Sequence, residues 1–354
     1  MTIRYKQLCS IWVCLFLAVQ TYGKIIYVNT NALGQNDGTS WQNAFTELDL
    51  ALSNIQPGDQ IWVAKGVYYP THSSNRHLSF VIPDGISLLG GFPANGTPGL
   101  SDRDPSLYVT TLSGDIDQDQ TLNNNSYTII YTLDVSSNTL IDGFTISGGN
   151  ADAVVSNAFP VKKENGGAAW FNESSTGAES GPTIKNCRFV GNKASNRGGG
   201  IFSMAGHSGK ANYRIENSLF ENNIASLGGG AIYNSQSGEG SECNPIIKNT
   251  EFTFNSSDGS GGAIYIDGGY YGEVSGLFEN CQFMNNTVNE LEGGAIFLNA
   301  VFNGKANTIF TGCRFINNQA LNGSGGAIYV DASVEGVANF NLTSCVLKGN
   351  QSNV

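Results

Sequence analysis

The stretch GGAIYID covers residues 261–267 and opens with two glycines. Related stretches occur at five other places: GGAAWFN begins at 166, GGGIFSM at 198, GGAIYNS at 229, GGAIFLN at 293 and GGAIYVD at 325. Neighbouring copies begin 31 or 32 residues apart. Glycine weakens the interior of a strand, so a strand of this kind needs support from strands on both sides. The regular spacing predicts that the other copies supply that support.

A second motif, exemplified by FENCQFMNN at 278–286, recurs in phase with the first. Its six copies begin at residues 184, 215, 247, 278, 310 and 342. Apolar and polar residues alternate within it, as in a strand. The absence of apolar residues at three-to-four spacing excludes tetratricopeptide and ankyrin arrays. The two phased motifs predict a solenoid in which each repeat is one coil and parallel strands stack about 4.8 Å apart.

Stacking turns each repeated position into a column of side chains. Three columns are predicted to face the core: Ile184, Ile215, Ile247, Phe278, Phe310 and Leu342; Cys187, Ser218, Thr250, Cys281, Cys313 and Cys345; and Phe189, Phe220, Phe252, Phe283, Phe315 and Leu347. The thiols are predicted to be packing groups, because Ser and Thr replace them in other coils. With Cys243 they make five cysteines after the leader, and no C-x-x-C pair signals a metal or redox site.

Polar residues also recur in columns. An asparagine closes every copy of the second motif: Asn192, Asn223, Asn255, Asn286, Asn318 and Asn350. Asparagine tolerates the left-handed backbone of a sharp corner, and its amide can bond to the amides above and below, so a corner ladder is predicted. On the outer face the column Lys185, Glu216, Lys248 and Glu279 alternates in sign. Neighbouring coils would then face opposite charges.

The GGAI and NCxFxxN motifs resemble the repeats of chlamydial-type polymorphic outer membrane proteins. They are also similar to secreted right-handed parallel β-helix proteins of the pectate-lyase-like superfamily, as are the upstream stretches 57–71, 80–93 and 110–119. The resemblance implies an all-β, right-handed parallel β-helix with a short N-terminal helix cap, and a secreted or cell-surface, outer-membrane-associated location. It does not define the activity, because this fold carries lyases, hydrolases and adhesins alike.

Three regions are predicted along the chain. Residues 1–23 have the pattern of a signal peptide: Arg4 and Lys6 precede an apolar segment at 8–19, with cleavage near Gly23. Residues 24–139 are predicted to form the N-terminal cap and first coils, and residues 140–354 the repeat coils. Because LKGNQSNV at 347–354 stops in mid-repeat, the chain is expected to be part of a longer protein.

The helix cap is predicted at residues 40–55, with Ser40 as its N-cap. One face of that helix would carry Trp41, Phe45, Leu48, Leu52 and Ile55. It would cover the open end of the first coil and protect its edge.

A net charge of −11 limits the partners. Nucleic acid is excluded as a partner because its phosphates demand a basic surface, and anionic membrane surfaces are disfavoured for the same reason. After the leader no membrane span is expected. The charge is compatible with neutral glycans and with divalent cations.

Aromatic residues supply the candidate binding surface. The fourth position after the first glycine of each GGAI copy is aromatic: Trp170, Phe202, Tyr233, Tyr265, Phe297 and Tyr329. If the preceding Ile points inward, alternation turns these rings outward into a stripe that can dock the apolar faces of sugar rings. The alternative is that the rings pack beneath the variable loops. Those loops, at 233–245, at 267–276 with Tyr270 and Tyr271, at 299–308 and at 331–340, are also predicted to bind.

Carboxylates give a second candidate site. The stretch DIDQDQ places Asp115, Asp117 and Asp119 at alternate positions, a spacing that suits calcium, although an acidic turn would look the same. No column brings a base, an acid and a metal ligand together; Arg188 and Arg314, for example, would lie about 19 Å apart by strand spacing.

The sequence therefore favours a secreted or cell-surface binding protein, adhesin-like or glycan-binding, with an extracellular glycan or a cell-surface molecule as its partner. The alternatives are a polysaccharide lyase or glycoside hydrolase acting on extracellular polysaccharide and, third, a structural stalk.

Overall fold

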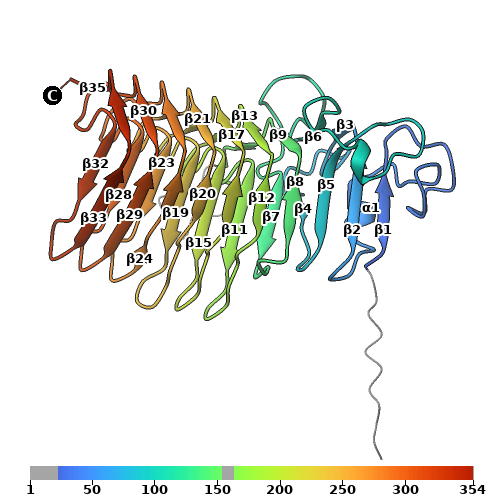
Figure 1. Ribbon diagram of the computed structural model, residues 1–354, viewed down its shortest axis with the longest axis horizontal. Helices are drawn as coiled ribbons and strands as arrows, with labels where there is room; N and C mark the ends of the chain where they lie inside the picture. The colour runs from blue at the N-terminus through green and yellow to red at the C-terminus, as the bar shows by residue number, and fades with distance from the viewer. Residues whose placement is uncertain (1–22, 154–162, 354) are drawn as a thin grey trace, which may run out of the picture.

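A computed structural model describes residues 23–153 and 163–353, so nearly all of the predicted signal peptide lies outside the described part. The described chain winds into about ten coils of a right-handed parallel β-helix, stacked along one axis (Figure 1). Every strand pairing in its four sheets is parallel, and each strand pairs with the equivalent strand of the next coil. The predicted fold is confirmed.

The strands of the four sheets follow one another within each coil. Sheet A contains β1 (Ile25–Val28), β2 (Gln60–Ala64), β5 (Ser87–Phe92), β8 (Leu140–Asp142), β12 (Thr183–Lys185), β16 (Arg214–Glu216), β20 (Ile246–Lys248), β24 (Glu273–Val274), β25 (Leu277–Glu279), β29 (Lys305–Thr311) and β33 (Val337–Thr343). Sheet B contains β3 (Gly66–Tyr68), β6 (Thr110–Ser113), β9 (Phe144–Ser147), β13 (Arg188–Val190), β17 (Leu219–Glu221), β21 (Glu251–Thr253), β26 (Gln282–Met284), β30 (Arg314–Ile316) and β34 (Val346–Lys348).

The other two sheets complete each coil. Sheet C contains β4 (Phe80–Val81), β7 (Ile130–Leu133), β11 (Trp170–Ser174), β15 (Ile201–Ala205), β19 (Ile232–Gln236), β23 (Ile264–Asp267), β28 (Ile296–Asn299) and β32 (Ile328–Asp331). Sheet D contains the short strands β10 (Asn150–Ala151), β14 (Lys193–Ala194), β18 (Ile224–Ala225), β22 (Ser256–Ser257), β27 (Thr287–Val288), β31 (Gln319–Ala320) and β35 (Gln351–Ser352). A single-turn 3₁₀ helix, η1 (Leu100–Asp102), lies between β5 and β6.

The strand register confirms the predicted core columns, although Leu347, in the last described coil, is 50% exposed. Ile184 pairs with Ile215, and the same column continues to Leu342. The Phe column stacks ring on ring, with Phe220 and Phe252 centroids 4.9 Å apart and 11° from parallel. Cys187 is buried and forms no disulfide, as the packing role requires. Burial raises the pKa of this thiol to about 12, so it stays protonated.

The asparagine ladder is confirmed as a hydrogen-bonded column. The prediction that the ladder asparagines themselves adopt the left-handed backbone conformation is wrong. Asn223 Nδ2 donates to Asn255 Oδ1 at 2.9 Å, and Asn255 Nδ2 donates to Asn286 Oδ1 at 3.0 Å. Among the described residues, none of the ladder asparagines has a positive φ. The residue before each of them does, as Asn222 shows with φ 54°. The turn therefore falls one residue earlier, which aims the ladder amide into the coil.

The alternating outer charges pair as predicted. Lys185 Nζ lies 3.0 Å from Glu216 Oε2, and Lys248 Nζ lies 2.7 Å from Glu279 Oε2. Each pair joins two successive coils through sheet A.

The N-terminal cap is present but shorter than predicted. Only α1 (Leu48–Leu52) is helical, next to β1 at the blue end of Figure 1. Leu48 and Leu52 pack into the main core, as expected of a cap. Ser40 is not the N-cap; Glu47 precedes α1 with an extended backbone and makes no capping side-chain bond.

The segment before α1 forms turns instead of a helix. The Asn43 N–H donates to Ser40 Oγ at 3.2 Å, and Phe45 forms a parallel bridge with Val28. Trp41 packs with Trp62 and Phe92 in a cluster separate from the core. The segment thus pairs with β1 through Phe45 instead of forming the first turns of the predicted helix, because nucleating a helix is costly. Within 23–153 and 163–353, no helix combines the length and apolarity needed to cross a membrane.

Candidate functional site

The outer face of sheet C carries a continuous column of aromatic rings. Register places these rings on successive coils: Tyr131, Phe171, Phe202, Tyr233, Tyr265, Phe297 and Tyr329. Trp170 does not belong to it, contrary to the prediction. Trp170 pairs with Ile201, lies in the main core and donates from Nε1 to Thr132 Oγ1 at 2.7 Å.

Most of the predicted rings are covered. Phe202 is fully buried, Tyr233 is 1% exposed and Phe297 is 6% exposed, whereas Tyr265 and Tyr329 are partly accessible. Phe171, Phe202 and Tyr233 form a cluster of their own outside the main core. The continuous exposed stripe is therefore wrong, and accessible aromatic surface is confined to parts of the column.

One such part opens into a cleft next to Tyr270, in the turn that precedes β24 (Glu273–Val274). The label of β24 lies at the lower edge of Figure 1. The cleft has a volume of about 520 Å³. Its lining combines three tyrosines with polar side chains: Arg197, Tyr233, Gln236, Ser237, Gly238, Tyr265, Asp267, Tyr270 and Asn299. Three of the four loops predicted to bind, 233–245, 267–276 and 299–308, contribute to it. We call it the tyrosine cleft.

Tyr233 and Tyr265 form the floor of the tyrosine cleft, with ring centroids 4.4 Å apart. The Arg197 guanidinium lies 5.1 Å from the centre of the Tyr233 ring. Burial, and next the Asp267 carboxylate, raise the pKa of both phenols well above the usual value. Both tyrosines are therefore neutral hydrogen-bond donors at any physiological pH.

Gly228 lets these rings lie flat against the corner of the coil. A Cβ atom at Gly228 would fall 2.8 Å from Tyr265 Cδ2 and 3.3 Å from Tyr233 Cε2. A side chain at this corner would therefore displace the floor of the cleft.

Asp267 is the polar centre of the tyrosine cleft. Its Oδ2 accepts from Tyr233 OH at 2.7 Å, and its Oδ1 accepts from Asn299 Nδ2 at 2.8 Å. A carboxylate has about four acceptor positions, so it can accept further hydrogen bonds from a ligand. Strand register continues this polar column from Asp267 through Asn299 to Asp331, two coils away.

Tyr270 forms a wall of the cleft at the tip of its turn. It is 63% exposed, has φ 55° and stacks on Phe302 of the next coil at 4.8 Å. Tyr271 is equally exposed with φ 66°, but it does not line the cleft. Bulky residues rarely adopt this left-handed conformation, and such strain is found preferentially at functional sites.

The acidic loop at residues 115–120 brings its three carboxylates together. One oxygen from each of Asp115, Asp117 and Asp119 lies within 4.8 Å of the others. Asp115 also accepts from the N–H groups of Asp119 and Gln120, at 3.1 and 3.0 Å, which closes the loop. Calcium takes oxygen ligands at 2.3–2.6 Å, so ligands around one ion can lie this far apart. The three residues could hold such an ion.

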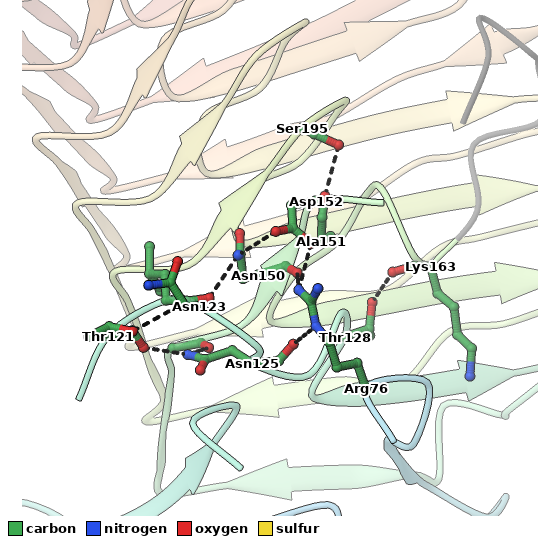
Figure 2. A network of polar contacts seen from close by, with 12 residues as sticks. Arg76, Thr121, Asn123, Asn125, Thr128, Asn150, Ala151, Asp152, Lys163 and Ser195 are labelled. Carbon is green, nitrogen blue, oxygen red and sulfur yellow. Dashed lines mark hydrogen bonds and ion pairs between the residues drawn. The ribbon is translucent and has the colours of Figure 1, made fainter. Parts of the chain in front are cut away.

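A network around Arg76 secures the end of this loop (Figure 2). Arg76 donates to the carbonyls of Asn125 and Asn150, at 2.6 and 3.0 Å, and pairs with Asp152 at 2.5 Å. Asn125 Nδ2 donates back to the carbonyl of Thr121 at 3.0 Å. These contacts fix the loop against the coil that contains β10.

We expect the wild-type protein to bind calcium in this loop, since the fold already gathers the three carboxylates. The triple substitution of Asp115, Asp117 and Asp119 by Asn should abolish the heat of calcium binding in isothermal titration calorimetry, because neutral amides lose the charge attraction. Equal calcium affinity in the triple variant would exclude this site.

Glu173 on β11 predicts a pH effect on stability. Burial, and to a lesser extent the Asp134 carboxylate, raise the pKa of Glu173 above its usual value, against a hydrogen bond of 3.1 Å from Tyr131 OH. The folded state then holds this proton to a higher pH than the unfolded state. The contribution of Glu173 to stability is therefore lost as the pH rises through the folded pKa.

The Glu173→Gln variant should consequently melt at a higher temperature than wild type at neutral pH, because the amide still accepts from Tyr131 without burying a charge. The difference should shrink below the usual pKa of a glutamate. Thermal unfolding at both pH values measures this, and a difference independent of pH would contradict it.

Comparison with known proteins agrees with this architecture. The Chlamydia polymorphic membrane protein repeat matches residues 186–204, 217–235 and 312–331. Among solved structures, pectate lyase Pel9A is similar over 94% of this chain and 79% of its own, with a TM-score of 0.50 and 14% identity. This protein is a right-handed parallel β-helix with polymorphic-membrane-protein-like repeats. The GH136 lacto-N-biosidase from Eubacterium ramulus is similar over 92% of this chain and 68% of its own, with a TM-score of 0.40 and 11% identity. No curated protein matches.

Proposed function

We propose that this protein is a secreted or cell-surface β-helix that binds an extracellular glycan in the tyrosine cleft. The observation that carries the proposal is the joint placement of accessible aromatic rings, Tyr265 and Tyr270, with the polar groups of Asp267 and Asn299. The apolar C–H face of a sugar ring can stack on a tyrosine while its hydroxyls bond to a carboxylate and an amide. Ligand pockets commonly combine an apolar lining with a few placed polar groups.

The surface location has support of its own. The matched repeats are named for a polymorphic membrane protein family, and the sequence predicts a leader at residues 1–23. The net charge of −11 opposes binding to nucleic acid and favours uncharged partners.

The geometry of the cleft suggests binding rather than catalysis. Asp267 already accepts from Tyr233 and Asn299, so both of its oxygens are engaged in holding side chains of the cleft. The buried thiol of Cys243, whose pKa burial raises to about 12, is no nucleophile.

The test is a glycan array screened with the wild-type chain, together with a lyase assay that follows unsaturated uronates by their ultraviolet absorbance. We expect retention of at least one glycan and no unsaturated product. Retention should fall in Tyr265→Ser. Release of unsaturated product would show that the protein is a lyase and overturn the proposed binding function. An array on which no glycan is retained would favour a structural stalk.

A further inference from the structure

The corner between sheets B and D has one residue that does not fit its position. The residue before each ladder asparagine has positive φ in the coils from β13 to β34: Gly191, Asn222, Phe254, Asn285, Asn317 and Gly349. Five of the six are Gly or Asn, which tolerate this conformation. The exception is Phe254, which has φ 55° and is 55% exposed.

Packing does not explain Phe254. A bulky residue at positive φ is strained, and a ring left mostly in water gains little from burial to offset that strain. Asparagine, present at the same corner in the coils on both sides, would make the turn without strain. The exposed ring is therefore available for a contact outside the folded chain.

Phe254 stands at one end of a shallow groove of about 520 Å³ on the outer surface. Amide and hydroxyl side chains of the next coils line it, and register places Thr287, Gln319 and Gln351 in one row. The groove runs along the solenoid axis to Gly349, three coil spacings away, or roughly 14 Å. We call it the amide groove.

The lining of the amide groove contains no ionisable side chain. In the part of the chain that the structure describes, the side-chain amides of Asn285, Asn317, Gln319 and Gln351 make no hydrogen bond to protein. Each amide both donates and accepts, as a sugar hydroxyl does, so the groove matches an elongated and uncharged polyhydroxyl ligand. We infer that the amide groove binds a linear neutral glycan parallel to the solenoid axis, with one sugar ring stacked on Phe254.

This second site does not rest on the tyrosine cleft, and one set of variants separates the two. Phe254→Asn restores the residue found in neighbouring coils, so its melting temperature should rise. Isothermal titration with cellohexaose, xylohexaose and mannohexaose should show at least a tenfold loss of affinity for the hexasaccharide that wild type binds. Tyr271→Asn makes the same kind of change at an exposed left-handed tyrosine outside both sites, and it should bind as wild type does.

Three outcomes would overturn the inference. Wild type could bind none of the three hexasaccharides. Phe254→Asn could bind as tightly as wild type. Binding could be lost in Tyr270→Asn and kept in Phe254→Asn, which would assign the hexasaccharide to the tyrosine cleft and leave the proposed function intact.

Discussion

Replacing Asn255 with alanine is expected to lower the free energy of unfolding by about 2–6 kcal/mol, since each of two buried polar groups left unpaired costs about 1–3 kcal/mol. Asn255 Oδ1 accepts from the backbone N–H and from Nδ2 of Asn223. Asn255 Nδ2 donates to the carbonyl of Phe220 at 2.9 Å. Alanine leaves the Asn223 N–H and the Phe220 carbonyl buried without these partners, whereas Asn223 Nδ2 keeps its bond to the Phe189 carbonyl. Urea denaturation of the purified variant measures the loss.

Asn339→Ala is the matched control. Asn339 Nδ2 also donates to an asparagine of the neighbouring coil, Asn307 Oδ1, at 2.9 Å, but on the exposed surface. Water replaces that bond, so the change should stay within about 0.5 kcal/mol. Similar losses in Asn255→Ala and Asn339→Ala would show that the interior ladder does not stabilise the solenoid.

The second large effect concerns the buried ion pair of Arg103 and Asp142. Arg103 Nη2 lies 2.6 Å from Asp142 Oδ1, and the side chains are only 13% and 12% exposed. Arg103 also donates to the carbonyl of Gly90, and Asn186 Nδ2 donates to Asp142 at 2.9 Å. Arg103→Met leaves the carboxylate without its cation, so the free energy of unfolding should fall by about 3–5 kcal/mol.

Two further variants check the cause of that loss. Asp142→Asn, added to Arg103→Met, removes the uncompensated charge and should recover part of the stability. Arg188→Met breaks an exposed pair with Glu221 at 3.5 Å and should cost less than about 1 kcal/mol. An Arg103→Met loss no greater than that of Arg188→Met would contradict the account.

The sequence predicts the coils well because each repeated position faces the same neighbours. Ile215, Phe252 and Asn255 occupy columns whose members share size and polarity, so the columns can be read from spacing alone. The first GGAI copy shows where this reading fails. Matching its first glycine, Gly166, to those of later copies puts Trp170 among the outer rings, whereas the structure pairs Trp170 with Ile201.

The backbone φ angles of the glycines identify the correct register of that copy. Gly167 has φ 63° and Gly198 has φ 66°, so these two glycines are equivalent. The apolar-aromatic pair of Trp170 and Phe171 then matches Ile201 and Phe202. Aligning the copies on this pair, instead of on the glycines, would have given the correct column.

The tyrosine cleft could not be derived from spacing. Arg197 and Tyr270 lie in different coils, and the loops between motifs decide how close they come. Exposure of the rings is likewise a property of the loops that cover them. The same applies to α1, where pairing of Phe45 with Val28 overrides the helical pattern.

The central claim is that a glycan occupies the tyrosine cleft, and the affinity of Tyr270→Asn for the glycan retained on the array tests it most directly. Tyr270 is exposed and has a conformation that asparagine tolerates, so relief of backbone strain should offset the lost stacking on Phe302 and the variant should fold. Isothermal titration should show the dissociation constant rising at least tenfold in Tyr270→Asn and staying at the wild-type value in the matched Tyr271→Asn. An unchanged constant in Tyr270→Asn, or equal losses in both variants, would contradict binding at this cleft.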